Sequence, residues 1–232
     1  MTVHMVQMRQ EYRDQLAQIE QQTLEGLDMV VVAIDRALEA LMTHDDELAS
    51  IVVADDDRID GRYLETHQAI LSLLALQAPV AGDLRVVAAL LHVIRHIERM
   101  GDQCVTIAKL VPLDGREPRT DRELLALIAR MGAHVRAQTL HAKRAFAARE
   151  VPLAEELVEL DRDVNGLNRE IFSRAVAIGD DAELREWAMH MTLVARCLER
   201  IGDNAVDIGE QTAFIVTGLF REFSDASQVR RD

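Results

Sequence analysis

Four pairs of acidic or amide side chains, each pair spaced four residues apart, are the part of the sequence with the clearest chemistry. The pairs are Asp56 with Asp60, Glu98 with Asp102, Asp161 with Asn165, and Glu199 with Asp203. Residues four apart lie on one face of a helix, with their Cβ atoms about 6 Å from each other. Carboxylate oxygens are the ligands that hard metal ions prefer. Each pair therefore offers oxygen ligands to a cation.

The pairs belong to an internal repeat. The segment Ile97–Asp102 (Ile-Glu-Arg-Met-Gly-Asp) reappears as Leu198–Asp203 (Leu-Glu-Arg-Ile-Gly-Asp), displaced by 101 positions. Upstream, the pair that begins at Asp56 is echoed by the pair that begins at Asp161. A period near 100 residues is too long for a solenoid repeat, so the sequence predicts a duplicated three-helix bundle.

The spacing also predicts that the pairs face each other. When two helices of equal rise fold back on each other, residues at equal distances from the turn meet. Asp56 and Asp60 lie as far before Pro79 as Asp102 and Glu98 lie after it. The same relation, centred at position 182, joins the pairs of the second half. Grouped carboxylates repel one another unless a cation lies between them, so we expect a metal site in each half.

Two features of the stripes around the acids bear on this prediction. Glu98 and Asp102 continue an apolar stripe, and Asp60 continues a line through Leu64 and Leu71, which suggests acids that interrupt core-facing rows. Asn165 stands where the first half has Asp60, so the second site loses a carboxylate. Asp207, four residues after Asp203, is expected to replace it.

Salt bridges are the alternative use of these acids. Arg99 and Arg200 follow Glu98 and Glu199 directly and offer a positive charge to each. On a helix, however, consecutive side chains point about 100° apart. Neutralisation by these arginines is therefore expected to be incomplete.

Apolar residues recur every three or four positions nearly from end to end, as in amphipathic helices. The four prolines leave long proline-free spans, as helices require. We predict an all-α fold of six long helices that form two sequence-related antiparallel three-helix bundles, with helices at 8–43, 46–76, 83–111, 120–148, 153–177 and 182–219. The first repeat is expected at 1–111, a linker at 112–119, the second repeat at 120–220 and a flexible tail at 221–232, with Asp83 as an N-cap.

Composition narrows the class of partner. The formal net charge of −14 argues against nucleic acid, because binding to phosphates requires Lys and Arg. It favours cations or basic protein surfaces. Cys104 and Cys197 fit small buried residues in a reduced compartment. The start of the chain lacks the apolar segment of a signal peptide, and no uncharged stretch is long enough to span a bilayer, so we expect a cytoplasmic protein.

The sequence contains no Gly-rich phosphate loop, no nucleophile elbow and no Glu-x-x-His pair of the kind that di-iron enzymes use. His92 and His96 have the spacing of helical metal ligands, but they lie nearly opposite Glu98 and Asp102 on the helix, which favours a polar edge or a subunit contact. We therefore expect a non-enzymatic protein. A helical adaptor with salt-bridged surface acids and no functional metal remains the alternative to a metal-binding regulator.

The motifs together resemble the PhoU family of bacterial phosphate-signalling regulators. The resemblance covers positions 1 to about 219, and it is carried by Pro79–Arg85 (Pro-Val-Ala-Gly-Asp-Leu-Arg), Glu98–Asp102, Glu199–Asp203 and the pair Asp56/Asp60. It implies a six-helix duplicated bundle whose acidic pairs bind divalent or trivalent metal (Fe, Mn, Mg or Zn). The implied ligand set is Asp56, Asp60, Glu98, Asp102, Asp161, Asn165, Glu199, Asp203 and Asp207.

The resemblance also implies a role and partners. The role is repression of phosphate uptake and of the phosphate-starvation response. The implied partners are a phosphate-sensing histidine kinase and the ATPase subunit of the phosphate ABC transporter, so contact with the membrane would be indirect, at its inner face. A homodimer is implied as well. For its interface the sequence offers an apolar row on the third helix: Val86, Leu90, Val93 and Ile97. The alternative is that a bundle of this type buries the row within one chain.

Overall fold

The computed structural model describes residues 2–77, 79–80, 82–115 and 119–223. These residues form six long helices and one 3-10 turn. The helices are α1 (Thr2–Thr43), α2 (Asp46–Gln77), α3 (Gly82–Leu110), α4 (Arg122–Ala148), α5 (Val151–Val176) and α6 (Ala182–Thr217), and the 3-10 turn η1 (Val111–Asp114) follows α3. The prediction of an all-α fold with six helices is confirmed.

Local sequence explains several helix ends. Asp121 and Asp181 are the N-caps of α4 and α6, where their carboxylates accept hydrogen bonds from Leu124 N (2.8 Å) and Leu184 N (3.2 Å). Asp83 was expected to cap α3, but that helix begins at Gly82 and Asp83 lies within its first turn. The predicted ends agree with the observed ones within two or three residues elsewhere, except that α1 begins earlier than position 8. Residues 116–118 of the predicted linker and 224–232 of the predicted tail lie outside the described residues.

The two halves repeat the same backbone path. Helix α1 turns into α2 through His44, and α4 turns into α5 through Arg149; both residues have a positive φ, of 52° and 56°. They lie 105 positions apart, which fixes the register between the halves for the first two helices of each. Asp56 and Asp161, also 105 apart, are therefore counterparts in the fold.

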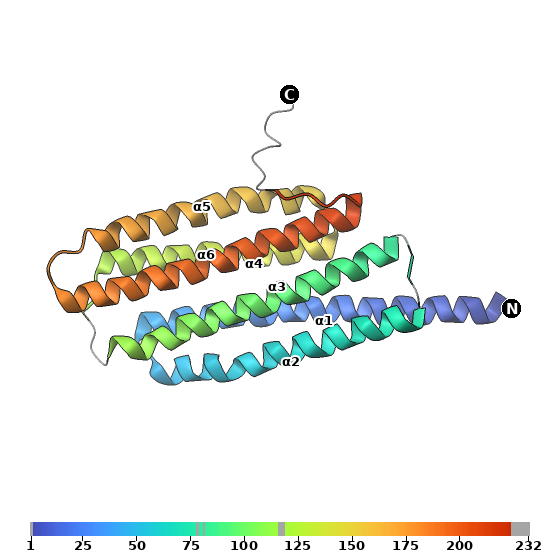
Figure 1. The fold of residues 1–232 in the computed structure, drawn as a ribbon, viewed down its shortest axis with the longest axis horizontal. Helices are drawn as coiled ribbons and strands as arrows, with labels where there is room; N and C mark the ends of the chain where they lie inside the picture. Colours follow the sequence, from blue (N-terminus) through green and yellow to red (C-terminus); the bar gives the residue numbers. More distant parts are fainter. Residues whose placement is uncertain (1, 78, 81, 116–118, 224–232) are drawn as a thin grey trace, which may run out of the picture.

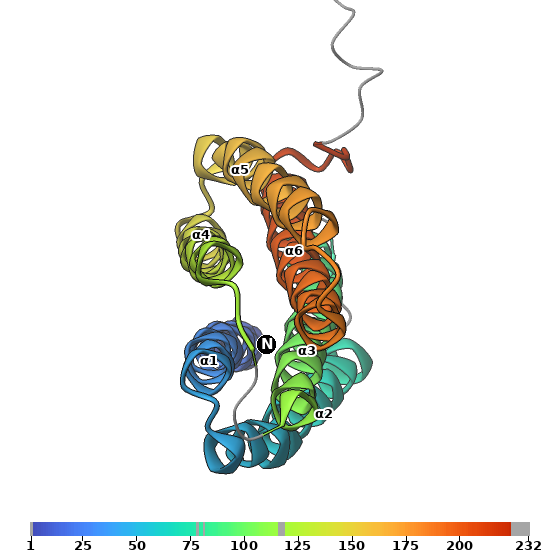
Figure 2. The same ribbon diagram turned by 90° about the vertical axis from the view of Figure 1, so that its left-hand side faces the viewer.

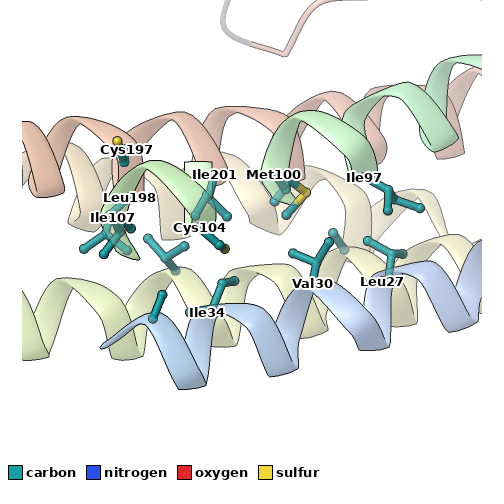
Figure 3. Packing of buried hydrophobic residues seen from close by; sticks show 14 of the residues in the cluster. Leu27, Val30, Ile34, Ile97, Met100, Cys104, Ile107, Cys197, Leu198 and Ile201 are labelled. Carbon is teal, nitrogen blue, oxygen red and sulfur yellow. The ribbon is translucent and has the colours of Figure 1, made fainter. Parts of the chain in front are cut away.

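Figure 1 shows the first three helices stacked against the last three along a shared long direction. The halves meet mainly through α1 against α4 and α3 against α6. In the end view of Figure 2, α2, α3, α6 and α5 form a curved row, and α1 and α4 lie side by side across from it. The junction of the halves is therefore a four-helix core, which Figure 3 shows from close by.

This central core is apolar. Leu27, Val30 and Ile34 of α1 are buried against residues of α3 such as Met100 and Cys104. At about 25 cal/mol per Å² of apolar surface removed from water, such burial is the main contribution that holds the halves together. Leu90, Val93 and Ile97 of α3 are also buried here, and Val86 packs against the same core. The expectation that this row forms a dimer surface is wrong, because Leu90, Val93 and Ile97 are already buried in the core of the same chain.

Ion pairs border the junction on the α1–α4 side. Lys143 Nζ lies 2.5 Å from Asp28 Oδ1, and Arg149 Nη2 lies 2.6 Å from Glu20 Oε1. Asp35 accepts from Arg136 Nε at 2.7 Å. Because the residue numbers fall along α1 as they rise along α4, the two helices run antiparallel. Among the described residues, none of the helices combines the length and the apolar composition needed to cross a membrane.

Candidate metal sites

The first-half acids lie on two neighbouring helices. Asp56 and Asp60 belong to α2, and Glu98 and Asp102 belong to the adjoining α3. Gly101 is buried at this contact, and a Cβ added there would lie 3.1 Å from Ile59 Cδ1 and 3.2 Å from Asp56 Oδ1. The glycine therefore lets α2 approach α3 closely at the level of the acids.

The pKa of Asp56 shows that the other acids of the first half lie near it. Its pKa is raised from 3.8 to about 6, first by burial, then by the negative charges of Asp60 and Asp102, and to a lesser degree by those of Asp57 and Glu98. Burial also raises the pKa of Glu98, with Asp102 and Asp60 adding to the rise and Arg95 opposing it. The four predicted ligands of the first half therefore lie within electrostatic range of one another.

Two oxygens of this group have no partner. Asp56 Oδ1 and Glu98 Oε2 are buried without a hydrogen bond among the described residues. A buried carboxylate oxygen without a donor is costly, by about 1–3 kcal/mol. An arrangement of clustered acids with unpartnered oxygens fits a bound cation, which would supply the missing positive charge.

In the second half the acid equivalent to Asp56 accepts hydrogen bonds from the protein. Asp161, the counterpart of Asp56, accepts from Asn165 Nδ2 at 2.7 Å and from Gln138 Nε2 at 3.4 Å. Burial raises its pKa, and both hydrogen bonds lower it. Asp203 across from it has a pKa raised by burial first and then by Asp161. Both oxygens of Asp161 are thus engaged within the protein, so the donor set of the second half fits a cation less well.

Arginines three residues upstream pair with both glutamates. Arg95 Nη1 lies 3.1 Å from Glu98 Oε1, and Arg196 pairs with Glu199 in the same way. Arg99 and Arg200, which the sequence offered for this role, are not the arginines that pair with the glutamates. The available signal for Arg95 and Arg196 was their spacing of three, which repeats in both halves and brings side chains together on a helix.

Asp207 has a partner in the other half of the molecule. Its carboxylate lies 3.4 Å from His96 Nδ1, which is also 2.8 Å from Asn204 Oδ1. Burial lowers the pKa of His96. His96 is thus a polar contact between α3 and α6, whereas His92 is exposed. Membership of Asp207 in the second metal site remains a prediction.

Asp60 does not interrupt a core-facing row. It is exposed, and the residues that continue its line, Leu64 and Leu71, are 63% and 44% exposed. The line lies on the outer face of α2, so the sequence-based expectation of a buried row was wrong there. Within the described part of the chain, no three His, Cys, Asp or Glu side chains are arranged closely enough to hold one ion. The predicted ligand groups remain predictions.

Gln138 of α4 is the site residue that sequence reasoning missed entirely. It is fully buried, and its amide nitrogen lies 3.3 Å from the carbonyl oxygen of Gly202 as well as 3.4 Å from Asp161. Its counterpart in the 105-residue register is Ala33, which has no polar group. The register could have identified the pair, but only the fold places position 138 beside the acids.

One protein-family model matches this chain twice, once in each half. The family model described as "PhoU domain" matches residues 23–111 and again residues 128–212. Each match covers most of one three-helix half and includes its acidic pairs.

Individual proteins match over nearly the same span. The chain is similar to "Phosphate-specific transport system accessory protein PhoU homolog 1" of Mycobacterium leprae, with 30% identity over 93% of this chain and 96% of the relative. The corresponding homolog of Zymomonas mobilis is 32% identical over 81% of this chain and 78% of its own. Among solved structures, the phosphate transport system regulatory protein PhoU of Streptococcus pneumoniae superposes with a TM-score of 0.84, covering 90% of this chain and 99% of that one at 24% identity.

Proposed function

The chain belongs to the PhoU family, and from this premise we propose that it is a metal-binding negative regulator of phosphate uptake and of the phosphate-starvation response. The observation that carries the proposal is the family match in both halves, which spans both sets of acidic pairs. Relatives that match most of this chain are named as accessory proteins of the phosphate-specific transport system.

The proposed regulation acts through protein contacts. With a net charge of −14 the chain is poorly suited to grip DNA, and its charge favours basic faces on other proteins. The proposed partners are a phosphate-sensing histidine kinase and the ATPase subunit of the phosphate ABC transporter. The protein would act in the cytoplasm and reach the inner face of the membrane through these partners.

The proposed metal is a divalent or trivalent ion (Fe, Mn, Mg or Zn). In the first half Asp56, Asp60, Glu98 and Asp102 would hold it, and the unpartnered Glu98 Oε2 supports this assignment. When bound, the ion would neutralise the mutual repulsion of the carboxylates. In the second half the candidates are Asp161, Asn165, Glu199, Asp203 and Asp207.

A homodimer is part of the proposal. Because the apolar row of α3 is already buried inside the chain, the surface available for it is elsewhere. Exposed apolar side chains are present along α2 and at the start of α3: Leu64, Leu71, Leu76 and Leu84. Light scattering at micromolar concentration should give about twice the 26.0 kDa mass of one chain. A mass of one chain would reject the dimer.

A deletion in the host tests the function. Loss of the gene should raise transporter expression and phosphate uptake even in phosphate-rich medium, because the repressing contact is absent. The variant Glu98→Ala, Asp102→Ala, Glu199→Ala and Asp203→Ala should fail to restore repression. A matched variant that removes four exposed acids elsewhere (Glu155, Asp163, Glu170 and Glu186) should restore it. If phosphate-responsive genes stay repressed in the deletion strain, and no second gene of the family is present, the proposed function is wrong.

A helical adaptor without a functional metal is the second candidate. The observation that favours it is the pairing of Arg95 with Glu98 and of Arg196 with Glu199. These ion pairs give both glutamates a positively charged partner without a metal ion. Calorimetric titration of the metal-free protein separates the candidates. Stoichiometric binding of Mn²⁺ that the Glu98→Ala, Asp102→Ala variant abolishes supports the regulator, and no binding of Mn²⁺, Mg²⁺, Fe²⁺ or Zn²⁺ supports the adaptor.

A further inference from the structure

A groove of about 220 Å³ opens beside Asp56 in the first half of the molecule. It lies between α1, α2 and α3, and it is walled mainly by apolar side chains: Val32, Ala33, Val52, Ile59, Cys104 and Val105. An apolar cavity of about 150 Å³ is large enough for benzene. The groove therefore has room for a ligand of roughly six to eight heavy atoms.

The charges around the groove are paired with one exception. Arg36 donates to Asp55 at 2.5 Å, and Arg58 also approaches Asp55 at 3.7 Å. Asp28 pairs with Lys143 of α4. Of the charged side chains that line the groove in the described structure, Asp56 alone has no ion pair, and its buried Oδ1 accepts no hydrogen bond. The groove thus combines apolar walls with one uncompensated carboxylate.

The second half shows what kind of group lies beside the equivalent carboxylate, Asp161. In the 105-residue register given by His44 and Arg149, Ala33 corresponds to Gln138. There the side chain of Gln138 is fully buried, and its Nε2 donates to Asp161, the counterpart of Asp56. The second half therefore fills with its own N–H donor the position that the first half leaves open beside Ala33.

We propose that the groove of the first half binds a small primary ammonium ion with a short apolar tail. The ammonium N–H donates to the carboxylate of Asp56, as Gln138 Nε2 donates to that of Asp161, and the tail packs against the apolar walls. A positive donor suits Asp56 better than a neutral one, because a hydrogen bond between charged groups is roughly twice as strong. The second oxygen of Asp56 stays available to a metal ion. This inference does not rest on the role in phosphate regulation.

Titration of the full chain with n-butylammonium chloride tests the proposal. Backbone amide NMR signals of Ala33, Asp56 and Gly101 should shift in a saturable manner, at ionic strength held constant with sodium chloride. n-Butanol, which has the same tail and no charge, should bind at least roughly tenfold more weakly, equivalent to about 1.4 kcal/mol. Equal binding of both compounds would show that Asp56 does not recognise the cation and would overturn the proposal.

Reciprocal substitutions locate the binding site. Ala33→Gln should fill the groove and abolish the n-butylammonium shifts, while Gln138→Ala should create a second set of shifts around Asp161 and Gly202. If Ala33→Gln does not fold, Ala33→Met serves as the filling variant. Retained binding in a folded filling variant would overturn the proposal. So would loss of all n-butylammonium shifts in saturating Mg²⁺, since the surface acids would then be the binding site.

Discussion

The two halves of this protein share three helices in the same order, yet the half-buried acid at the equivalent position has different partners in each half. In the first half four neighbouring carboxylates raise the pKa of Asp56, and its Oδ1 has no donor among the described residues. In the second half Asp161 accepts hydrogen bonds from Gln138 and Asn165. A donor or cation for Asp56 Oδ1 would therefore have to come from outside the protein, whereas Asp161 obtains its hydrogen-bond donors from the protein itself.

Two positions account for this difference. Ala33 corresponds to Gln138, and Asp60 corresponds to Asn165, so each exchange replaces an amide of the second half by a group that cannot donate. The backbone that carries these positions is shared, down to the left-handed residue between the first two helices of each half. The shared scaffold thus fixes where the acids lie, and the side chains at these two positions decide whether the acid accepts a hydrogen bond from within the protein.

The largest expected effect is stabilisation by metal in the first half. Mn²⁺ at about one hundred times its dissociation constant should raise the free energy of unfolding by about 2.7 kcal/mol, measured by urea denaturation. Asp56→Asn with Glu98→Gln should remove this increment, and the matched pair Asp161→Asn with Glu199→Gln should leave most of it. If both double variants lost the Mn²⁺ stabilisation equally, the two halves would not differ in metal binding.

The next effect concerns the internal donor of the second half. Gln138→Ala should lower the free energy of unfolding of the metal-free protein by about 2 kcal/mol, because it leaves a cavity and takes away the donor of Asp161 Oδ1. Ala33→Gln should cost less than about 1 kcal/mol, since it fills an existing groove and gives Asp56 a donor. Both values come from urea melts. An Ala33→Gln variant less stable than Gln138→Ala would mean that the two positions are not equivalent.

A smaller effect should appear in the pH dependence of stability. The pKa of Asp56 is about 6 in the folded protein and near 3.8 in the unfolded chain, so the folded state binds this proton more tightly. The stabilisation is complete below about pH 4 and is lost as the pH rises to about 6. The loss should amount to roughly 1–2 kcal/mol, because partial exposure screens the charges.

Metal-free samples of the wild type and Asp56→Asn, melted between pH 4 and pH 7, isolate this contribution. The difference in free energy of unfolding between them should narrow toward pH 4 and favour Asp56→Asn above pH 6. A constant difference across the range would show that Asp56 has an ordinary pKa, and the contrast with the second half would lose its electrostatic basis.

The smallest effect tests the lost carboxylate of the second half. Asn165→Asp should tighten Mn²⁺ binding at that half by roughly tenfold, about 1.4 kcal/mol, through the added charge. It should also destabilise the metal-free protein by about 1 kcal/mol, because the 2.7 Å hydrogen bond to Asp161 is lost. Calorimetry in the Asp56→Asn, Glu98→Gln background measures the second half alone. Unchanged affinity there would show that position 165 does not contribute a ligand.

The sequence by itself determined the elements and their duplication. Apolar periodicity and the positions of Pro and Gly gave six helices close to the observed ones, because helix formation depends on residues three and four apart. The repeated Glu-Arg-x-Gly-Asp segments identified the two halves and the family. Equal distances from the turn at Pro79 placed Asp56 and Asp102 on adjoining helices, where each is within electrostatic range of the other.

Only the tertiary structure decided what surrounds those acids. The row of Leu90, Val93 and Ile97 looked available for a partner, but it is buried in the core of the same chain. Gln138 lies 23 residues before Asp161, and no local rule predicts their hydrogen bond. The groove beside Ala33 likewise exists because α1, α2 and α3 meet there with a small residue at the contact. Periodicity specifies which face of a helix is apolar, whereas contacts between distant segments depend on how whole helices pack, and that packing gives the two halves their different chemistry.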